Sequence, residues 1–254
     1  MGEIRVTEES GVWDVQIHRP EKKNALTRAM YEALAAVVER AGTPDRGARV
    51  IVFRGVEGAF SAGNDLSDFL EHEIDGEAPA PRFLYALAKS RVPMVAAVDG
   101  VAVGIGTTLL FHCDFVFASN RSFFALPFVD LSLVPEAASS VLLPRLCGHL
   151  NASKLLMLGE PFDASAALAY GIVGEVCEPA ELESKATEIA KKLAAKPRRA
   201  LQETKALLRM EREGISDRIG REIEIFSELL ESDAAREAMS AFLEKRPPDR
   251  SKYD

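Results

Sequence analysis

The sequence predicts an α/β fold with several parallel strands, followed by a C-terminal region made almost wholly of helices. In the first half of the chain, short apolar runs alternate with stretches whose apolar residues recur at helical spacing. This alternation is typical of a sheet with parallel strands. From about residue 180 onward, helical spacing is found almost everywhere. No linker, repeat or low-complexity segment separates the two regions, so we expect the helical tail to be an appendage and not an independent module.

The expected elements begin with a half-buried strand at residues 12–17, where apolar and polar residues alternate. A helix follows, and Thr27 is placed to cap its N-terminus. Its apolar face is formed by Met30, Leu34, Val37, Val38 and Ala41. Uninterrupted apolar runs at 50–53 and 92–98 predict strands that are buried on both faces.

A short helix over 107–112 and a strand at 115–117 end the alternating half. Beyond them, an amphipathic helix ends at Pro197. Its apolar face is formed by Leu182, Ala186, Ile189 and Leu193. A longer apolar stripe follows, formed by Ile215, Ile219, Ile223, Phe226 and Leu230. The period alone favours packing of this stripe against its own domain, with a subunit interface as the alternative.

The composition excludes several classes of function. A net charge of −8 and a pI near 5.2 argue against nonspecific nucleic-acid binding, which needs a basic surface. The 3 cysteines are too widely spaced for a zinc site or a disulfide scaffold, so we expect reduced thiols. Neither a secretion signal nor a transmembrane run is recognisable. We therefore expect a cytoplasmic protein without a membrane partner.

Common catalytic patterns are missing as well. The 4 histidines are scattered and form no metal-binding pair, so we expect no metal site. No Gly-x-Ser-x-Gly turn of a serine hydrolase occurs. Gly104-Ile105-Gly106 starts like a dinucleotide fingerprint, but Leu109 stands where its third glycine belongs. A nicotinamide site is therefore not expected.

Two turns that contain glycine each follow a predicted buried strand. The first covers residues 58–66 and the second covers 100–107. Small residues allow a ligand to approach the backbone, where N–H groups can bind an oxygen that becomes negatively charged. A helix that begins after Gly106 would add a favourable dipole. Such turns are more often ordinary loops, so the pattern alone does not decide between the two interpretations.

Together these segments resemble the crotonase (enoyl-CoA hydratase/isomerase) superfamily. The resemblance rests on Phe60-Ser61-Ala62-Gly63-Asn64-Asp65-Leu66 followed by Ala96-Ala97-Val98-Asp99-Gly100-Val101-Ala102-Val103-Gly104-Ile105-Gly106. Three further segments agree with it: Arg19-Pro20-Glu21-Lys22-Lys23-Asn24-Ala25-Leu26, Cys113-Asp114-Phe115-Val116-Phe117-Ala118 and Ala166-Ala167-Leu168-Ala169-Tyr170-Gly171-Ile172-Val173. The motifs occur in order along nearly the whole chain and are specific as a set.

The resemblance implies a spiral core of ββα turns over residues 1–190 and a helical oligomerisation region over 191–254. It implies a homotrimer or a dimer of trimers, and it shifts our interpretation of the C-terminal stripe toward a subunit interface. It also implies an acyl-CoA substrate whose thioester oxygen is held by the N–H groups of Ala62 and Ile105. Coenzyme A is then part of the substrate, and no separate cofactor is expected.

The resemblance also bears on the reaction. Hydratases of this family use two glutamates, and the matching positions here are Thr108 and Phe128. The segment around Pro135-Glu136 instead resembles the Δ3,Δ2-enoyl-CoA isomerases of the peroxisomal type, in which this glutamate is the catalytic base. The Ala-Gly-Asn-Asp-Leu form of the first motif favours the same branch. Without the family, Glu136 could simply be a residue of a first helical turn, stabilised by the helix dipole.

The predicted mechanism is a proton shuttle by one glutamate. Glu136 would remove a C2 proton of a 3-enoyl-CoA and return a proton to C4, aided by a pKa raised in an apolar pocket of Phe128, Leu131 and Val134. Substrate contacts are expected from Lys23, Ala25, Gly63, Asn64, Asp65, Leu66, Gly104 and Phe128. Candidate cations for the CoA phosphates lie in the early turn and near the C-terminus: Arg19, Lys22, Lys23, Lys245 and Arg246.

Other reactions of the same superfamily stay open at this point. Hydrolysis, C–C cleavage or decarboxylation of an acyl-CoA could use Asp130 or Glu160. A non-catalytic acyl-CoA-binding homologue is a further alternative, because both hydratase glutamates are absent. Only the isomerase needs Glu136 and moves a double bond without adding water.

Overall fold

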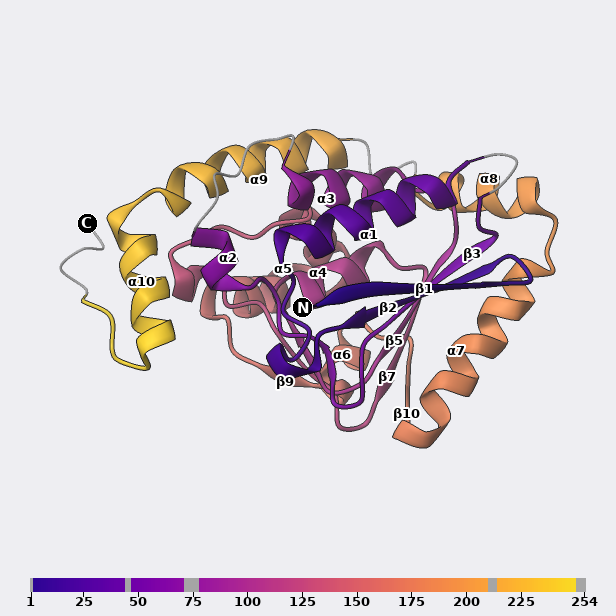
Figure 1. The fold of residues 1–254 in the computed structure, drawn as a ribbon, viewed down its shortest axis with the longest axis horizontal. Coiled ribbons are helices and arrows are strands. Elements are labelled where there is room, and N and C mark those ends of the chain that lie inside the picture. The colour runs from indigo at the N-terminus through magenta and orange to yellow at the C-terminus, as the bar shows by residue number, and fades with distance from the viewer. Residues whose placement is uncertain (1, 44–46, 71–77, 210–213, 250–254) are drawn as a thin grey trace.

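Two sheets form the centre of the computed structural model, which describes residues 2–43, 47–70, 78–209 and 214–249 (Figure 1). The large sheet contains, in spatial order, β1 (Glu3–Glu9), β2 (Val12–His18), β3 (Val50–Arg54), β5 (Met94–Val98), β7 (Phe115–Ser119) and β10 (Glu175–Cys177). The small sheet contains β4 (Ala59–Ser61), β6 (Val101–Val103), β8 (Phe123–Ala125) and β9 (Phe162–Asp163). All pairs between strands are parallel except β1 with β2 and β8 with β9.

Pairs of consecutive strands give the fold its repeat. β3, β5 and β7 lie in the large sheet, and each is followed directly by a strand of the small sheet, β4, β6 or β8. A helical segment closes each repeat: α2 (Leu66–Leu70) with α3 (Pro79–Lys89), then α4 (Ile105–Thr108), then α5 (Ser139–Leu158). The predicted α/β class and its core of ββα turns are therefore confirmed.

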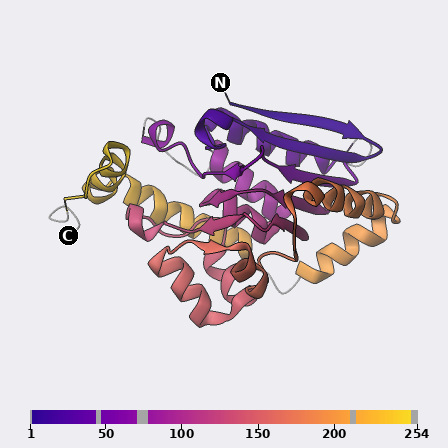
Figure 2. The same ribbon diagram turned by 90° about the horizontal axis from the view of Figure 1, so that it is seen from below.

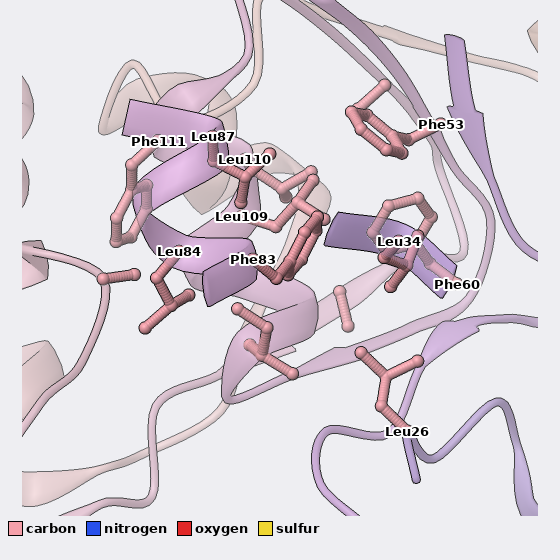
Figure 3. Packing of buried hydrophobic residues seen from close by; sticks show 14 of the residues in the cluster. Leu26, Leu34, Phe53, Phe60, Phe83, Leu84, Leu87, Leu109, Leu110 and Phe111 are labelled. Atoms are coloured by element: carbon pink, nitrogen blue, oxygen red, sulfur yellow. The ribbon is translucent and has the colours of Figure 1, made fainter. Parts of the chain in front are cut away.

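The central strands β3 and β5 of the large sheet are buried on both faces because helices cover each side. Alternate residues point to opposite faces, so Ile51 and Phe53 of β3 join the main core with α1 (Arg28–Ala41) and α3. Val50 and Val52 face the opposite way, toward α7 (Pro179–Ala194). Each such side chain contributes about 1.5–3 kcal/mol when fully buried. Figure 3 shows the main core around α3, where its buried side chains lie beside Leu109, Leu110 and Phe111.

The remaining elements enclose this core. They are the 3₁₀ turns η1 (Pro20–Lys22), η2 (Leu109–His112) and η3 (Val129–Leu131), and the helices α6 (Ala164–Ala169), α8 (Arg198–Arg209), α9 (Ile215–Leu230) and α10 (Asp233–Glu244). Seen from below in Figure 2, α5 and α6 (pink) lie on the side of the molecule opposite α1 (indigo). α10 lies at one end of the molecule, far from α7 and α8 (Figure 1).

Several boundaries differ from the sequence-based expectation. Thr27 caps α1 as predicted, accepting the Met30 N–H at 3.4 Å. The strand predicted at 92–98 begins at Met94, since Pro93 has no N–H for the ladder. The helix predicted over 107–112 begins earlier, at Ile105, and becomes a 3₁₀ turn from Leu109 onward. β1 was not predicted, because most of its residues are exposed and only two are apolar core contacts.

Much of the apolar stripe of α9 packs within its own chain. Ile219, Phe226 and Leu230 are buried where α9 packs on α3. This packing accounts for that part of the stripe, and the expected subunit contact through the C-terminal helices stays a prediction. The expected boundary between residues 190 and 191 falls inside α7, whose buried face continues to Ala190.

Candidate active site

The two predicted glycine turns meet, because each carries a glycine where the other chain segment leaves no room. A Cβ on Gly106 would lie 2.5 Å from the Ser61 carbonyl oxygen, and one on Gly63 would lie 3.0 Å from the Val103 carbonyl oxygen. Gly104 also has φ 54° and ψ −120°, a conformation that other residues rarely adopt. Both turns follow strands that are parallel neighbours in the small sheet.

A pocket of about 580 Å³ lies at this meeting point. Residues from both turns and from the early turn after η1 line one side, and η3, α9, α10 and the following tail line the other. The lining consists of Lys22, Ala25, Ala62, Gly63, Asn64, Asp65, Leu66, Ser67, Phe69, Val103, Gly104, Pro127, Phe128, Asp130, Leu131, Leu133, Phe226, Ala238, Ala241, Phe242, Leu243, Arg246 and Pro248. Volume and apolar character suit a small-molecule ligand.

The backbone donors of the first turn differ from the prediction. Ala62 donates its N–H to the Lys23 carbonyl at 2.9 Å, so it is not available to a ligand. The residues on either side of Asn64 both bond to Leu26. The Gly63 carbonyl accepts the Leu26 N–H at 2.7 Å, and the Asp65 N–H donates to the Leu26 carbonyl at 2.9 Å. Among the described residues, the Asn64 N–H itself has no acceptor. The assignment of Ala62 as a donor is therefore wrong, and Asn64 takes its place.

The second turn carries, at the predicted position Ile105, a backbone N–H group without an acceptor in the residues that the structure describes. Ile105 is the first residue of α4, and the N–H groups of Thr107 and Thr108 already bond to the Gly104 carbonyl. Within the described part of the chain, the Ile105 N–H has no acceptor, as is usual for the first turn of a helix. Asn64 and Ile105 thus carry backbone donors on two turns in contact with one another.

Glu136 is a buried carboxyl group beside α4. Thr108 donates its hydroxyl to the Glu136 Oε1 at 3.4 Å, one helical turn after Ile105. Burial, and then the charge of Glu222, raise the pKa of Glu136 to about 8, although the Thr108 hydrogen bond lowers it. A carboxylate with such a pKa is a strong base for a protein side chain at neutral pH.

The surroundings of Glu136 differ from those expected. It faces a cavity of about 20 Å³ lined by Phe69, Ala80, Pro81, Leu84, Glu136, Ala137, Ile219, Glu222, Ile223 and Phe226. The predicted neighbours Phe128 and Leu131 line the larger pocket instead. Phe69 and Phe226 line both spaces, and their rings meet edge to face with centroids 5.6 Å apart. This aromatic pair is thus a wall shared by the larger pocket and the base.

Polar side chains of other elements hold the first glycine turn in place. The hydroxyl of buried Tyr31 bonds to the Asn64 side-chain oxygen. Burial, and then the charge of Glu136, raise the pKa of Tyr31, which places the phenol near the carboxyl group. Arg19 pairs with Asp65 at 2.7 Å and donates to the Ala25 carbonyl at 2.9 Å. Arg19 is therefore a structural tie between the early turn and the first glycine turn.

The model of the enoyl-CoA hydratase/isomerase family matches residues 7–252. The chain belongs to this family. Both glycine turns and the strands that carry them lie within the matched residues.

Named relatives in the family include both isomerases and hydratases. Enoyl-CoA delta isomerase 2 of Rattus norvegicus is 35% identical over 213 residues, which cover 81% of this chain. Those residues are only 54% of the rat protein, so this chain spans about half of its length. The 2,3-dehydroadipyl-CoA hydratase of Escherichia coli (strain K12) is 33% identical over 98% of each chain. Among solved structures, OdaA of Pseudomonas aeruginosa has a TM-score of 0.91 at 41% identity, covering 94% of this chain and 98% of its own.

Most of the predicted substrate contacts line the larger pocket. They are Ala25, Gly63, Asn64, Asp65, Leu66, Gly104 and Phe128. The exception is Lys23, which is exposed and contributes its carbonyl to Ala62, while its neighbour Lys22 lines the pocket. Sequence reasoning missed Phe69, Phe226 and the wall formed by α10. Only the basic pair at 245–246 gave a signal for that wall, and its Arg246 lines the pocket.

A second, more open groove of about 990 Å³ lies between α1, α3 and α8. Part of its basic lining is already engaged: Arg82 pairs with Glu39, and Lys89 lies over the Tyr85 ring. We place the candidate active site in the smaller pocket because both glycine turns meet there. Within the described residues, no group of three or more His, Cys, Asp or Glu side chains could hold a metal ion, and no helix could span a membrane.

Proposed function

We propose that this family member is a Δ3,Δ2-enoyl-CoA isomerase with Glu136 as its base. The observation that carries the proposal is the position of Glu136: a buried carboxyl group of raised pKa, bonded to Thr108 one turn beyond the Ile105 donor. Thr108 and Phe128 stand at the two positions where hydratases have glutamates. A threonine and a phenylalanine cannot activate a water molecule as carboxylates do.

The proposed reaction needs one base and one oxyanion site. The thioester oxygen of a 3-enoyl-CoA accepts hydrogen bonds from the N–H groups of Asn64 and Ile105. Ionised Glu136 removes a proton from C2, and the electron pair spreads over the oxygen, C2 and C4 as a dienolate. The carboxylic acid then protonates C4, the double bond forms between C2 and C3, and Glu136 is ionised again. An oxyanion donor contributes roughly 10²–10³ in rate.

One side chain can serve both steps because C2 and C4 lie on the same face of a short allylic unit. The carboxyl group must reach both carbons without exchanging its proton with bulk water. Glu136 is buried in the cavity next to the larger pocket, which limits exchange with water, and the acyl chain must displace the shared Phe69–Phe226 wall to reach it. We further propose that the CoA part passes Ala25 and Gly63, with Lys22 and Arg246 near its anionic groups. The expected homotrimer or dimer of trimers stays a prediction.

Conversion of a 3-enoyl-CoA to the trans-2-enoyl-CoA, followed by absorbance, tests the proposal. Wild type should convert the substrate rapidly, and Glu136→Gln should lose at least about a hundredfold in kcat. Asp130→Asn is the matched control. Asp130 and Asp65 are the acidic residues in the lining of the larger pocket. A wild-type enzyme without conversion, or an unimpaired Glu136→Gln variant, would overturn the assignment.

Water addition is the second candidate reaction, since the E. coli relative that matches over the full length is named a hydratase. The same preparation should be given a trans-2-enoyl-CoA in water, and loss of the enoyl absorbance should be followed. We expect no appreciable hydration. Hydration faster than isomerisation would favour this second candidate. A dependence on Asp130 instead of Glu136 would indicate hydrolysis or C–C cleavage. The other candidate for those reactions, Glu160, does not line the pocket.

A further inference from the structure

A second carboxyl group, Glu222 of α9, reaches the segment that carries Glu136. Its side chain is buried and accepts two hydrogen bonds, from the Ala138 N–H at 2.7 Å and from the Ser140 hydroxyl at 2.5 Å. Both donors belong to the turn and the first residues of α5 directly after Glu136. Glu222 also lines the 20 Å³ cavity together with Glu136.

The turn after Glu136 needs such support. Ala137 and Ala138 both adopt left-handed backbone conformations, each with φ 56°, which residues with a Cβ avoid. α5 has no side-chain cap of its own at Ala138, so its first N–H groups depend on other elements. His112 holds the preceding carbonyl: its Nε2–H donates to the Ala137 oxygen at 2.8 Å. The strained turn is therefore fixed from η2 on one side and from α9 on the other.

We propose that Glu222 is a positioning residue for Glu136: its carboxylate caps the left-handed turn that carries the base and forms with it a carboxyl pair enclosed in one cavity. The proposal deepens, and rests on, the proposed isomerase function. Glu222 itself need not touch the substrate, because its contacts run through the turn and the cavity.

The charges around the pair determine the order in which its members ionise. Burial raises the pKa of Glu222 to about 7, against the hydrogen bonds from Ser140 and Ala138 and the charge of Arg218. Glu136 has the higher pKa and so loses its proton when Glu222 is already negative. Tyr31 is the titratable group on the α1 side, and His112 faces the turn from η2. α3 contributes only Ala80, Pro81 and Leu84 to this cavity.

This order has a use in the proposed reaction. A negative Glu222 makes Glu136 more basic and disfavours loss of its proton to water between the two transfers. Removing only the charge should therefore change the proton affinity of Glu136, whereas removing the whole side chain should also release the turn. The two effects can be separated by substitution.

The test compares Glu222→Gln, which keeps the shape and an acceptor oxygen, with Glu222→Ala, which keeps neither. Carboxyl groups are observed by ¹³C NMR of protein labelled at the glutamate Cδ, and Glu136→Gln assigns the Glu136 signal. The pH profile of kcat/KM for the 3-enoyl-CoA is recorded in parallel. Glu228→Gln, on the exposed side of the same helix, is the matched control.

We expect Glu222→Gln to lower the titration midpoint of Glu136, and the acid limb of the kcat/KM profile, by on the order of one pH unit. Glu222→Ala should also lower kcat. Thr108→Val should move the midpoint in the opposite direction, since its hydrogen bond lowers the pKa of Glu136. An unchanged midpoint and acid limb in Glu222→Gln would overturn the proposal, because a purely structural residue would not move them.

The reciprocal measurement covers the case in which a Glu222 variant does not fold. In a coupled pair each titration is observed at the other member. Since Glu222 ionises while Glu136 is still protonated, Glu136→Gln should leave the Glu222 midpoint near its wild-type value but remove the second, smaller step that ionisation of Glu136 adds to the Glu222 signal. A wild-type Glu222 signal without that second step would contradict the pairing. The NMR titration needs no substrate. A shifted midpoint in an enzyme without isomerase activity would reject the proposed function and keep the carboxyl pair, whereas activity with unshifted midpoints would do the reverse.

Discussion

The two halves of the candidate site both contain backbone with positive φ angles, but on different types of residue. At the oxyanion turns, positive φ angles occur at glycines, Gly63 with φ 94° and Gly104 with φ 54°. At the base turn they occur at two consecutive alanines, 137 and 138, for which the left-handed conformation costs roughly 1–2 kcal/mol per residue. The positive φ angles of the donor turns are thus tolerated because the residues are glycines, whereas those of the base turn are supported by side chains from distant elements.

This difference predicts which part of the site each kind of substitution should affect most. A change of backbone shape should affect the two glycine turns most, because their positive φ angles fall on residues without a Cβ. A change of charge or hydrogen bonding should affect the base turn most, because His112 and Glu222 hold it from two sides. Four expected outcomes test this contrast, in order of decreasing effect on activity or stability.

Gly106→Ala should have the largest effect. The added Cβ would lie 2.5 Å from the Ser61 carbonyl oxygen and would push α4 away from β4. Since Ile105 precedes it directly, the donor pair would separate, and we expect a loss of roughly 10²–10³ in kcat. The measurement is the isomerase assay with circular dichroism as a folding control. A folded variant with full activity would show that contact between the turns is not required.

Phe226→Leu should change both stability and selectivity. It removes the edge-to-face contact with Phe69, which contributes about 0.5–1.5 kcal/mol beyond its buried area. It also thins the wall between the larger pocket and the cavity of Glu136. We expect a lower midpoint in urea unfolding and a higher kcat/KM for longer acyl chains relative to shorter ones. Unchanged chain-length preference would exclude this ring as part of the acyl boundary.

The stability of the wild-type protein should fall as the pH rises from about 5 to 7.5. The pKa values of Glu136 and Glu222, about 8 and about 7, lie above the ordinary 4.5. The folded state therefore holds protons that the unfolded state has released, and their contribution is lost as the pH rises through the folded values. We expect the free energy of unfolding to drop by at least about 1 kcal/mol.

Urea unfolding at several pH values measures this dependence, and the double variant Glu136→Gln/Glu222→Gln should flatten it. Two other shifted groups act outside this window. Burial opposes ionisation of Asp99, but hydrogen bonds from Arg121 and Gly58 lower its pKa to about 2. Burial lowers the pKa of Lys205 to about 8, so its contribution changes at higher pH. A double variant as pH-dependent as wild type would contradict the assignment.

Ala138→Gly should have the smallest effect and a stabilising sign. Glycine adopts φ 56° without the Cβ penalty, although it loses more backbone entropy on folding, so we expect a gain of at most about 1 kcal/mol. Gly104→Ala is the matched substitution in the opposite direction and should destabilise, because φ 54° with ψ −120° suits glycine alone. Differential scanning calorimetry of both variants checks the signs. Stability changes of the same sign in both variants would contradict the contrast between the two turns.

The sequence was sufficient for the parts of this site that are local. The parallel strands, the Thr27 cap, the Ile105 donor and Glu136 follow from short motifs and their spacing. The donor of the first turn was misassigned to Ala62, because motif position does not reveal that its N–H bonds to the Lys23 carbonyl. That bond depends on the fold of the early turn.

Longer-range features could not be read from the chain. Glu222 is 84 residues from Ala138, and on the sequence it appears as one more charge beside an apolar stripe. The stripe itself has the period of any buried helix, so it could not distinguish packing on α3 from packing on another subunit. The wall formed by Phe69 and Phe226 likewise joins residues of α2 and α9 that only the tertiary structure brings together.

The outer strand of the large sheet has a consequence for the protein in crowded solution. β1 is the antiparallel edge strand, and Glu3, Arg5, Glu8 and Glu9 are exposed along it. An edge offers unpaired N–H and C=O groups to any passing strand, and charged side chains disfavour such pairing. We therefore expect growth of the sheet by strand addition to be disfavoured at β1, so that the protein resists aggregation through this edge.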